Sequence, residues 1–179
     1  MREVLYRVAA SVDGYIAGPG GEVDWIVHDP AVDFAKIYQS VDTVLLGRRT
    51  YELTRQPGAP PWPKDWQVYV FSRTLPPEQH PGVTVVSGEA GPRVAALRAA
   101  PGRQIWLFGG GSLFGSLLAV RQVDLVEVLV VPVLLGGGIP LLQTGSPLTR
   151  LALEQVEKYP SGLLSLRYRV PDAATGRRD

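Results

Sequence analysis

The sequence predicts a single α/β domain with a mostly parallel central sheet, flanking helices and an antiparallel hairpin at the C-terminal edge. Three observations predict this class. Apolar, β-branched runs recur along the chain, and several are nearly continuous, as in strands covered on both faces. Helical patterns alternate with these runs, which is typical of a parallel sheet. The last two runs follow each other across a short turn, which indicates a hairpin.

The predicted strands can be placed in chain order. They occupy residues 4–10, 43–47, 67–72, 83–87, 104–109 and 125–135. The hairpin is predicted from residues 150–159 and 163–170 around the turn "PSG". The domain therefore spans residues 1–170, and residues 171–179 are expected to form a flexible tail.

Two helices are predicted between the strands. In residues 29–40, Asp29 has the side chain of an N-cap and Pro30 stands at the first helical position, while Phe34, Ile37 and Tyr38 share one face. In residues 112–119, leucine and phenylalanine recur at four-residue spacing. Residues 55–66, "RQPGAPPWPKDW", indicate a proline-rich surface loop.

Composition excludes several classes of protein. The 179 residues include 18 basic and 17 acidic side chains, so the net charge of +1 gives no field that favours nucleic acid. There is no cysteine, which excludes disulfides and cysteine metal sites, and we expect no metal. The N-terminal segment has charges among a short apolar run, so no signal peptide or membrane span is expected. These features favour a cytoplasmic protein without nucleic-acid or membrane partners.

The segment "WLFGGGSLFGSLL" contains the first candidate binding turn. Gly109, Gly110 and Gly111 follow a predicted strand and precede a predicted helix, whose first amides bind phosphate where no side chain blocks them. A tight turn explains three glycines equally well, so both interpretations stay open. Phe114 stands where a Rossmann motif has its third glycine. The second triple glycine, residues 136–138, is interpreted as a turn because no amphipathic helix follows it.

Two further turns at predicted strand ends have anion-binding side chains. Gly47 ends one strand, and Arg48, Arg49 and Thr50 begin the next helix. Cations at a helix N-terminus oppose the helix dipole, so two arginines there favour a bound anion, although exposure alone also explains them. Ser72, Arg73 and Thr74 follow another strand and supply hydroxyls and a guanidinium group.

The three turns belong to strands whose carboxyl ends meet at one edge of an open sheet, where such sheets bind ligands. A dinucleotide with a pyrophosphate and an additional ribose phosphate would use all three turns. That description fits NADPH.

Five motifs occur in an order that resembles a known family. They are "AASVDGYIAGPGGEVDW", "DTVLLGRRTYE", "VYVFSRTL", "WLFGGGSLFGSLL" and "VDLVEVLVVPVLLGGGIPLL". Over roughly residues 2–170 the chain resembles the dihydrofolate reductase-like fold, and within it the RibD C-terminal domain, the reductase of bacterial riboflavin biosynthesis. The resemblance implies NADPH bound across the strand ends and a homodimer.

The resemblance also implies roles for the candidate residues. Gly47 to Thr50 would hold cofactor phosphates, and Ser72, Arg73 and Thr74 would meet the adenosine 2′-phosphate. Residues 109–113, which include Ser112 and Leu113, would hold the pyrophosphate. The backbone of Ala9 and Ala10, with Ile16, would border the nicotinamide. The glycine-rich loop at residues 11–21 is expected to act as a lid.

The substrate side departs from dihydrofolate reductases, where a carboxylate on the first helix assists protonation of the pterin. Asp29 is the candidate for that catalytic role, with the N-cap as the structural alternative. Asp13, Trp25 and Phe34 are candidate substrate contacts, the two aromatic rings by stacking on a flat heterocycle. The riboflavin-type substrate has a phosphate, for which Arg55 and Lys64 are candidates.

Three functions follow from these observations. The first is an NADPH-dependent reductase of the riboflavin type, which transfers hydride to a small heterocyclic or sugar-derived substrate. The second is a dihydrofolate reductase-like activity, which requires Asp29 to face the pocket. The third is a nucleotide-binding protein without turnover. In each case a homodimer is expected through the C-terminal hairpin, because an unpaired edge strand invites pairing.

Overall fold

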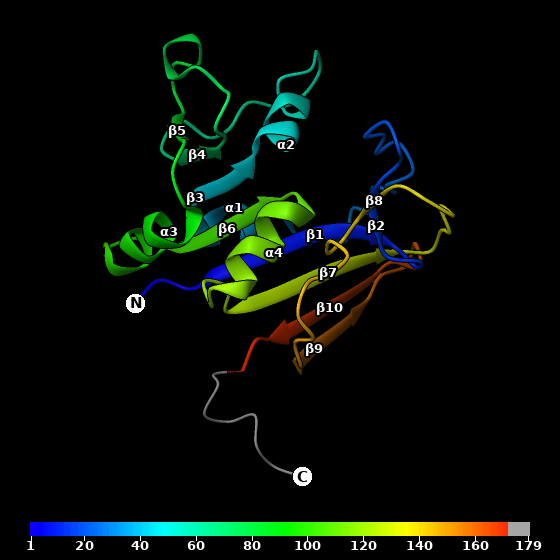
Figure 1. The fold of residues 1–179 in the computed structure, drawn as a ribbon. Helices are drawn as coiled ribbons and strands as arrows, with labels where there is room; N and C mark the ends of the chain where they lie inside the picture. The colour runs from blue at the N-terminus through cyan, green and yellow to red at the C-terminus, as the bar shows by residue number, and fades with distance from the viewer. Residues whose placement is uncertain (172–179) are drawn as a thin grey trace.

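The protein is built around one eight-stranded sheet. The computed structural model describes residues 1–171, and the tail predicted at 171–179 lies almost entirely outside that range. The strand order is β5-β4-β3-β6-β1-β7-β10-β9, and Figure 1 shows the strands side by side in this order. All neighbours from β5 to β7 are parallel, and only the pairs β7 with β10 and β10 with β9 are antiparallel.

Each predicted strand is present. The sheet contains β1 (Val4–Ser11), β3 (Val41–Gly47), β4 (Gln67–Phe71), β5 (Thr84–Val86), β6 (Gln104–Gly109), β7 (Leu125–Val131), β9 (Ala152–Lys158) and β10 (Leu164–Arg169). The prediction for β7 was too long, because the strand ends before Pro132, which has no amide hydrogen for the sheet. The C-terminal hairpin is confirmed.

Within residues 1–171, four α-helices connect the strands: α1 (Phe34–Ser40), α2 (Arg48–Leu53), α3 (Ala90–Ala99) and α4 (Gly111–Ala119), with one 3-10 turn, η1 (Pro77–Gln79). The predicted start of the first helix, at Asp29 and Pro30, was wrong. Asp33, not Asp29, is the N-cap, and its carboxylate accepts a hydrogen bond from the backbone amide of Lys36 at 2.9 Å. Helix α3 was not predicted, since its small alanines and glycine give a weak apolar face.

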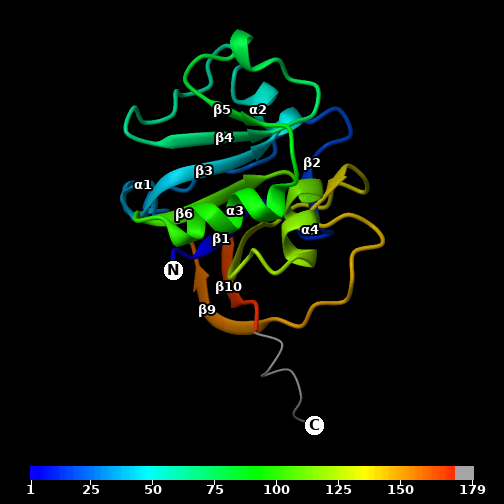
Figure 2. The same cartoon turned by 60° about the vertical axis from the view of Figure 1, so that its left-hand side comes forward.

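Two apolar layers cover the sheet. Helices α3 and α4 lie on one face (Figures 1 and 2), where Tyr6 stacks on Phe114 with ring centroids 3.9 Å apart. The opposite face packs Trp106, Trp66 and Tyr51 against the centre of the sheet. Helix α1 has no buried residue and contacts this second layer through Ile37 and through Tyr38, whose ring centroid lies 5.5 Å from that of Trp66. The sheet is therefore tightly covered on one face and partly open on the other.

A small second sheet joins the loop that follows β1 to the loop that follows β7. It pairs β2 (Tyr15–Ala17) with β8 (Ile139–Pro140), neither of which was predicted. Before β8, residues 136–138 form the predicted bend, and a Cβ on Gly138 would collide with the backbone oxygen of Ala17. None of the helices in residues 1–171 is long and apolar enough to cross a membrane.

Candidate active site

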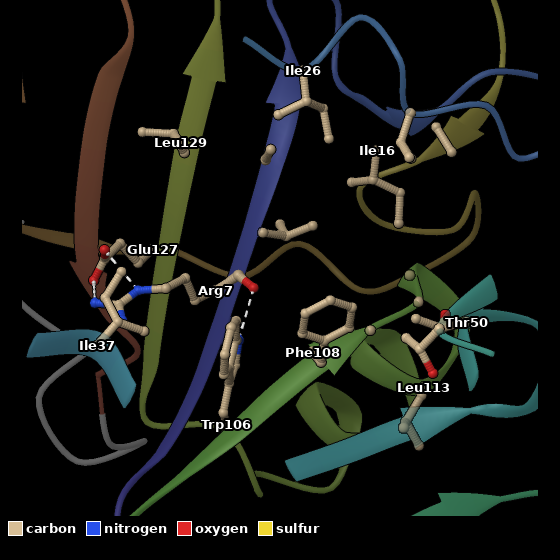
Figure 3. A pocket seen from close by; sticks show the side chains of 18 of the residues that line it. Arg7, Ile16, Ile26, Ile37, Thr50, Trp106, Phe108, Leu113, Glu127 and Leu129 are labelled. Carbon is tan, nitrogen blue, oxygen red and sulfur yellow. Dashed lines mark hydrogen bonds and ion pairs between the residues drawn. The ribbon is translucent and has the colours of Figure 1, made fainter. Parts of the chain in front are cut away.

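A cavity of about 1570 Å³ lies against the open face and the carboxyl ends of the central strands. Its walls come from β1, β6 and β7, the loop before α1, and the N-termini of α2 and α4. Figure 3 shows Thr50, Leu113 and Ile16 on one side of this cavity and Arg7 and Glu127 on the other. The cavity thus has two ends of different chemistry. We call the end with Thr50 and Leu113 the turn end and the end with Arg7 and Glu127 the floor end.

The turn end brings together two of the predicted binding turns. A Cβ on Gly47 would lie 3.7 Å from the amide nitrogen of Gly110, and a Cβ on Gly110 would lie 3.3 Å from Oγ1 of Thr50. Gly109 has φ +141°, which side chains disfavour. A Cβ on Gly111 would approach the carbonyl oxygen of Pro140 to 2.5 Å. The turn therefore needs glycine for its own packing, and it also keeps this edge free of side chains.

Helix α4 begins at this turn without a side-chain cap, after Gly110 at the N-cap position. Its first amides have no partner within the helix, as at every helix start. Gly111, Ser112 and Leu113 all line the cavity, so this helix start faces the space where a ligand would lie. The arrangement suits an anionic group.

Helix α2 brings its two arginines to the same end. Arg48 and Arg49 are exposed and line the cavity with Thr50. Arg48 lies 3.6 Å from the carboxylate of Glu52, with both side chains nearly half exposed. Such a pair is weak in water, so the guanidinium group stays accessible to a ligand.

The third predicted turn lies beyond the cavity lining. Its Ser72 hydroxyl accepts hydrogen bonds from the backbone amides of Thr74 and Leu75 at 3.2 and 3.0 Å, which shapes the turn. Arg73 and Thr74 are exposed beside it, and Phe71 at the end of β4 does line the cavity. This turn therefore borders the turn end without entering it.

At the end of β1, Ala9 lines the cavity and Ala10 belongs to the core beneath α4. Ile16 reaches the cavity from β2. Ala9 and Ile16 therefore give the cavity an apolar stretch, which helps to exclude water, whereas Ala10 does not line it.

The structure does not bring Asp29 into the cavity lining. Asp29 is only 3% exposed, and its two carboxylate oxygens accept hydrogen bonds from the backbone amides of Ala31 at 2.8 Å and Ser161 at 2.9 Å. Hydrogen bonds from the Ser161 hydroxyl and these two amides lower the pKa of the Asp29 carboxyl. The carboxylate therefore joins the loop before α1 to the hairpin turn.

Among the candidate substrate contacts, only Phe34 lines the cavity, where it is 40% exposed. The carboxylate of Asp13 accepts hydrogen bonds from the backbone amides of Leu135 and Gly136, and a hydrogen bond with Ser11 is the largest cause that lowers its pKa. The Trp25 indole donates to the carbonyl of Glu22.

The basic residues considered for a substrate phosphate lie elsewhere. Arg55 contacts the ring of His80 at 3.0 Å, and neither Arg55 nor Lys64 lines the cavity.

Several cavity residues were missed by the sequence analysis: Arg7, Trp106, Phe108, Glu127, Tyr159 and Arg167. One signal was present, because Arg7 and Glu127 are single opposite charges inside otherwise apolar strands. To predict that these two side chains pair, one must know that β1 and β7 are neighbours in the sheet.

Burial, with the Glu157 carboxylate, raises the pKa of Tyr159 to about 12, so this phenol stays protonated near neutral pH.

The chain is similar to two uncharacterized proteins of Bacillus subtilis. It is 30% identical to YyaP over 178 residues, which covers 93% of this chain and 94% of YyaP. It is 34% identical to YwjB over 162 residues, which covers 88% of this chain and 92% of YwjB. Both relatives therefore match it along nearly their whole length.

Solved structures share the fold. A putative riboflavin biosynthesis protein from Shewanella sp. PV-4 superposes with a TM-score of 0.81 at 26% identity, covering 96% of this chain and all of that one. Dihydrofolate reductase from Enterococcus faecalis, complexed with NADP(H), superposes with a TM-score of 0.68 at 19% identity, covering 95% and 97%. The fold is thus dihydrofolate reductase-like. Because the RibD C-terminal domain model matches residues 2–165, the chain belongs to the RibD C-terminal domain family.

Proposed function

We propose that this protein is an NADPH-dependent reductase of the riboflavin type, which transfers hydride to a small heterocyclic or sugar-derived substrate. The observation that carries the proposal is the turn end of the cavity. There the uncapped start of α4 and two exposed arginines, Arg48 and Arg49, face one space. The family and the NADP(H)-bound neighbour support a nicotinamide cofactor.

The residues fit NADPH in three places. The amides of Gly111 to Leu113 and the arginines of α2 would hold the pyrophosphate, and Arg73 would meet the 2′-phosphate. The backbone at Ala9 and Ala10, with Ile16, would border the nicotinamide. When bound there, NADPH would supply the hydride.

The chain's own residues would orient the reactants and exclude water. Ala9 and Ile16 line the middle of the cavity, and Phe34 and Phe108 line its sides. We assign the substrate to the floor end because the turn end is suited to phosphates. A dihydrofolate-like mechanism through Asp29 has less support, since backbone amides already occupy both oxygens of that carboxylate.

Calorimetric titration with NADPH and NADH tests the cofactor assignment. We expect NADPH to bind at least tenfold more tightly than NADH, about 1.4 kcal/mol. Arg73→Ala should remove that preference, whereas Arg150→Ala, which changes an exposed arginine outside the cavity lining, should preserve it. Failure of both cofactors to bind would contradict the reductase proposal. Cofactor binding without turnover of any substrate would favour the nucleotide-binding alternative.

We also propose a homodimer through strand β9. Every residue of this edge strand is exposed, including Leu153 at 58% and Val156 at 56%. Pairing with a second copy would cover these apolar side chains and the unpaired backbone groups of the edge. Light scattering on the purified protein should give twice the chain mass, and Val156→Lys should shift it towards the monomer. A monomeric wild type at micromolar concentration would contradict this proposal.

A further inference from the structure

Three charged side chains form a ladder across the floor end. The guanidinium group of Arg7 on β1 donates to both oxygens of Glu127 on β7, from Nε at 2.9 Å and from Nη2 at 2.8 Å. Arg167 on β10 donates from Nη1 to Oε2 of Glu127 at 3.3 Å. The three residues are direct neighbours in the sheet register, and Figure 3 shows Arg7 and Glu127 side by side in the cavity.

This ladder occupies the groups that would bind an anion. A guanidinium group recognises phosphate or carboxylate through a fork of two N–H donors, and Arg7 already uses such a fork on Glu127. Ser165 also donates to Oε1 of Glu127, at 3.4 Å, and Arg167 lies 3.5 Å from Glu154. A ligand anion would have to displace the Glu127 carboxylate, which is only 14% exposed, and would be repelled by it.

The charges that line the cavity are distributed unevenly. At the floor end and on α1, the basic residues Arg7, Lys36 and Arg167 are balanced by the acidic residues Asp33, Glu127 and Glu157. At the turn end, no acidic residue among the described residues lines the cavity, and Glu52, 3.6 Å from Arg48, lies outside the lining. The net positive charge of the cavity lining therefore lies at the turn end.

Apolar and aromatic side chains complete the floor end. Ile37, Phe34, Trp106, Phe108 and Leu129 all line the cavity beside the ladder. The Trp106 indole nitrogen is occupied, since it donates to the carbonyl of Arg7 at 3.0 Å. The faces of these rings are suited to a flat apolar group.

We infer that the floor end takes an uncharged ring compound, and that Glu127 is the specificity-determining residue that keeps phosphates and carboxylates out by neutralising Arg7 and Arg167. This inference rests on the proposed function, because it takes the ring compound to be the substrate of the reductase. It narrows the proposed substrates to uncharged ones. It separates this chain from the phosphorylated substrate that the riboflavin-type resemblance implies.

A matched pair of probes tests the inference in the intact protein. Uridine and uridine 5′-monophosphate differ only by a phosphate, and their binding is measured by calorimetry. The titrations contain no cofactor and use an Arg48→Gln/Arg49→Gln background, which removes both arginines from the turn end and leaves only the backbone amides of α4 there. We expect uridine to bind and the monophosphate to bind no more than twofold better. A tenfold preference for the monophosphate would overturn the inference without testing the proposed function.

Replacement of Glu127 gives the converse test. Glu127→Gln keeps the shape of the side chain but leaves Arg7 without a carboxylate partner and Arg167 with Glu154 alone, so we expect affinity for the monophosphate to rise at least tenfold while that for uridine stays within threefold. Glu154→Gln is the matched control, because Glu154 contacts Arg167 but does not line the cavity. No gain in Glu127→Gln, or an equal gain in both variants, would overturn the inference. If Glu127→Gln does not fold, the comparison of the two probes on unchanged Glu127 still decides.

Discussion

Asp29 accepts a hydrogen bond from the backbone amide of Ser161 at 2.9 Å, so the loop before α1 is fixed to the turn between β9 and β10. This contact joins segments far apart in the sequence, and residues beside it, Ala31 and Tyr159, line the cavity. We therefore expect Asp29→Asn to lower the midpoint of urea unfolding while NADPH affinity stays within twofold. Asp24→Asn, at an exposed loop position, is the control. A loss of turnover with unchanged stability would instead support a catalytic Asp29.

The stabilising effect of Asp29 should depend on pH in a defined direction. Its pKa is lower in the folded protein than the ordinary value of about 3.9 in the unfolded chain. The contribution is therefore complete above the unfolded pKa and is lost as the pH falls through the folded pKa. Urea unfolding at several pH values measures the free energy of unfolding. The difference in this free energy between wild type and Asp29→Asn should be present at pH 6 and should decrease below about pH 4. A constant difference down to pH 2 would contradict this prediction.

Tyr159 should give the opposite dependence at alkaline pH. Its pKa is raised to about 12, mainly by burial, from the ordinary value of about 10. The folded state thus favours the neutral phenol, and its contribution is complete below pH 10 and is lost as the pH rises towards 12. Ultraviolet titration should show one tyrosine ionising near this value in wild type and not in Tyr159→Phe. Titration curves that coincide near pH 12 in wild type and in Tyr159→Phe would contradict this.

Gly111 should be intolerant of any side chain. An added Cβ would lie 2.5 Å from the carbonyl oxygen of Pro140 and 2.9 Å from that of Leu141, and neither backbone atom moves easily. Overpacking of this kind costs about 1–3 kcal/mol. Gly137→Ala is the matched control, because nothing lies within 4 Å of its Cβ position. Chemical denaturation measures both, and equal stabilities of the two variants would contradict the packing described at this turn.

The two arginine sites should affect the cofactors differently. Arg48 and Arg49 are assigned to phosphates that NADPH and NADH share, so Arg48→Gln/Arg49→Gln should weaken both cofactors by a similar factor, tenfold or more. A hydrogen bond to a charged group contributes about 1.5–3 kcal/mol, which corresponds to this loss. Calorimetry with both cofactors distinguishes this pattern from Arg73→Ala, which should affect NADPH alone. If the double variant lost affinity for NADPH alone, Arg48 and Arg49 would instead be assigned to the 2′-phosphate, which would contradict the assignment of Arg73.

Local patterns predicted most of the sheet. Continuous apolar runs identified the central strands, and the turn "PSG" identified the hairpin. Side chains that act over long distances were not predictable in this way. Asp29 and Pro30 have the local pattern of a helix start, yet the Asp29 carboxylate accepts a hydrogen bond from the backbone amide of Ser161. The helix begins four residues after Pro30, with Asp33 as its N-cap.

The turn end of the cavity was easier to predict than the floor end. Gly47 and Gly109 each end a strand, and parallel strands place their carboxyl ends together. The floor end depends on which strands are neighbours. Arg7, Glu127 and Arg167 meet only because β7 lies between β1 and β10, and that order is not visible in any local run of residues.

The central place of β1 in the sheet has a consequence for synthesis on the ribosome. Both neighbours of β1 come late in the chain, since Val4 pairs with Ile105 and Leu5 pairs with Leu125. At roughly 5–20 residues added per second, the first strand waits several seconds before either partner emerges. Such non-local pairing makes folding slow and leaves an apolar strand exposed meanwhile. The nascent chain is therefore expected to depend on chaperones until β7 has left the exit tunnel.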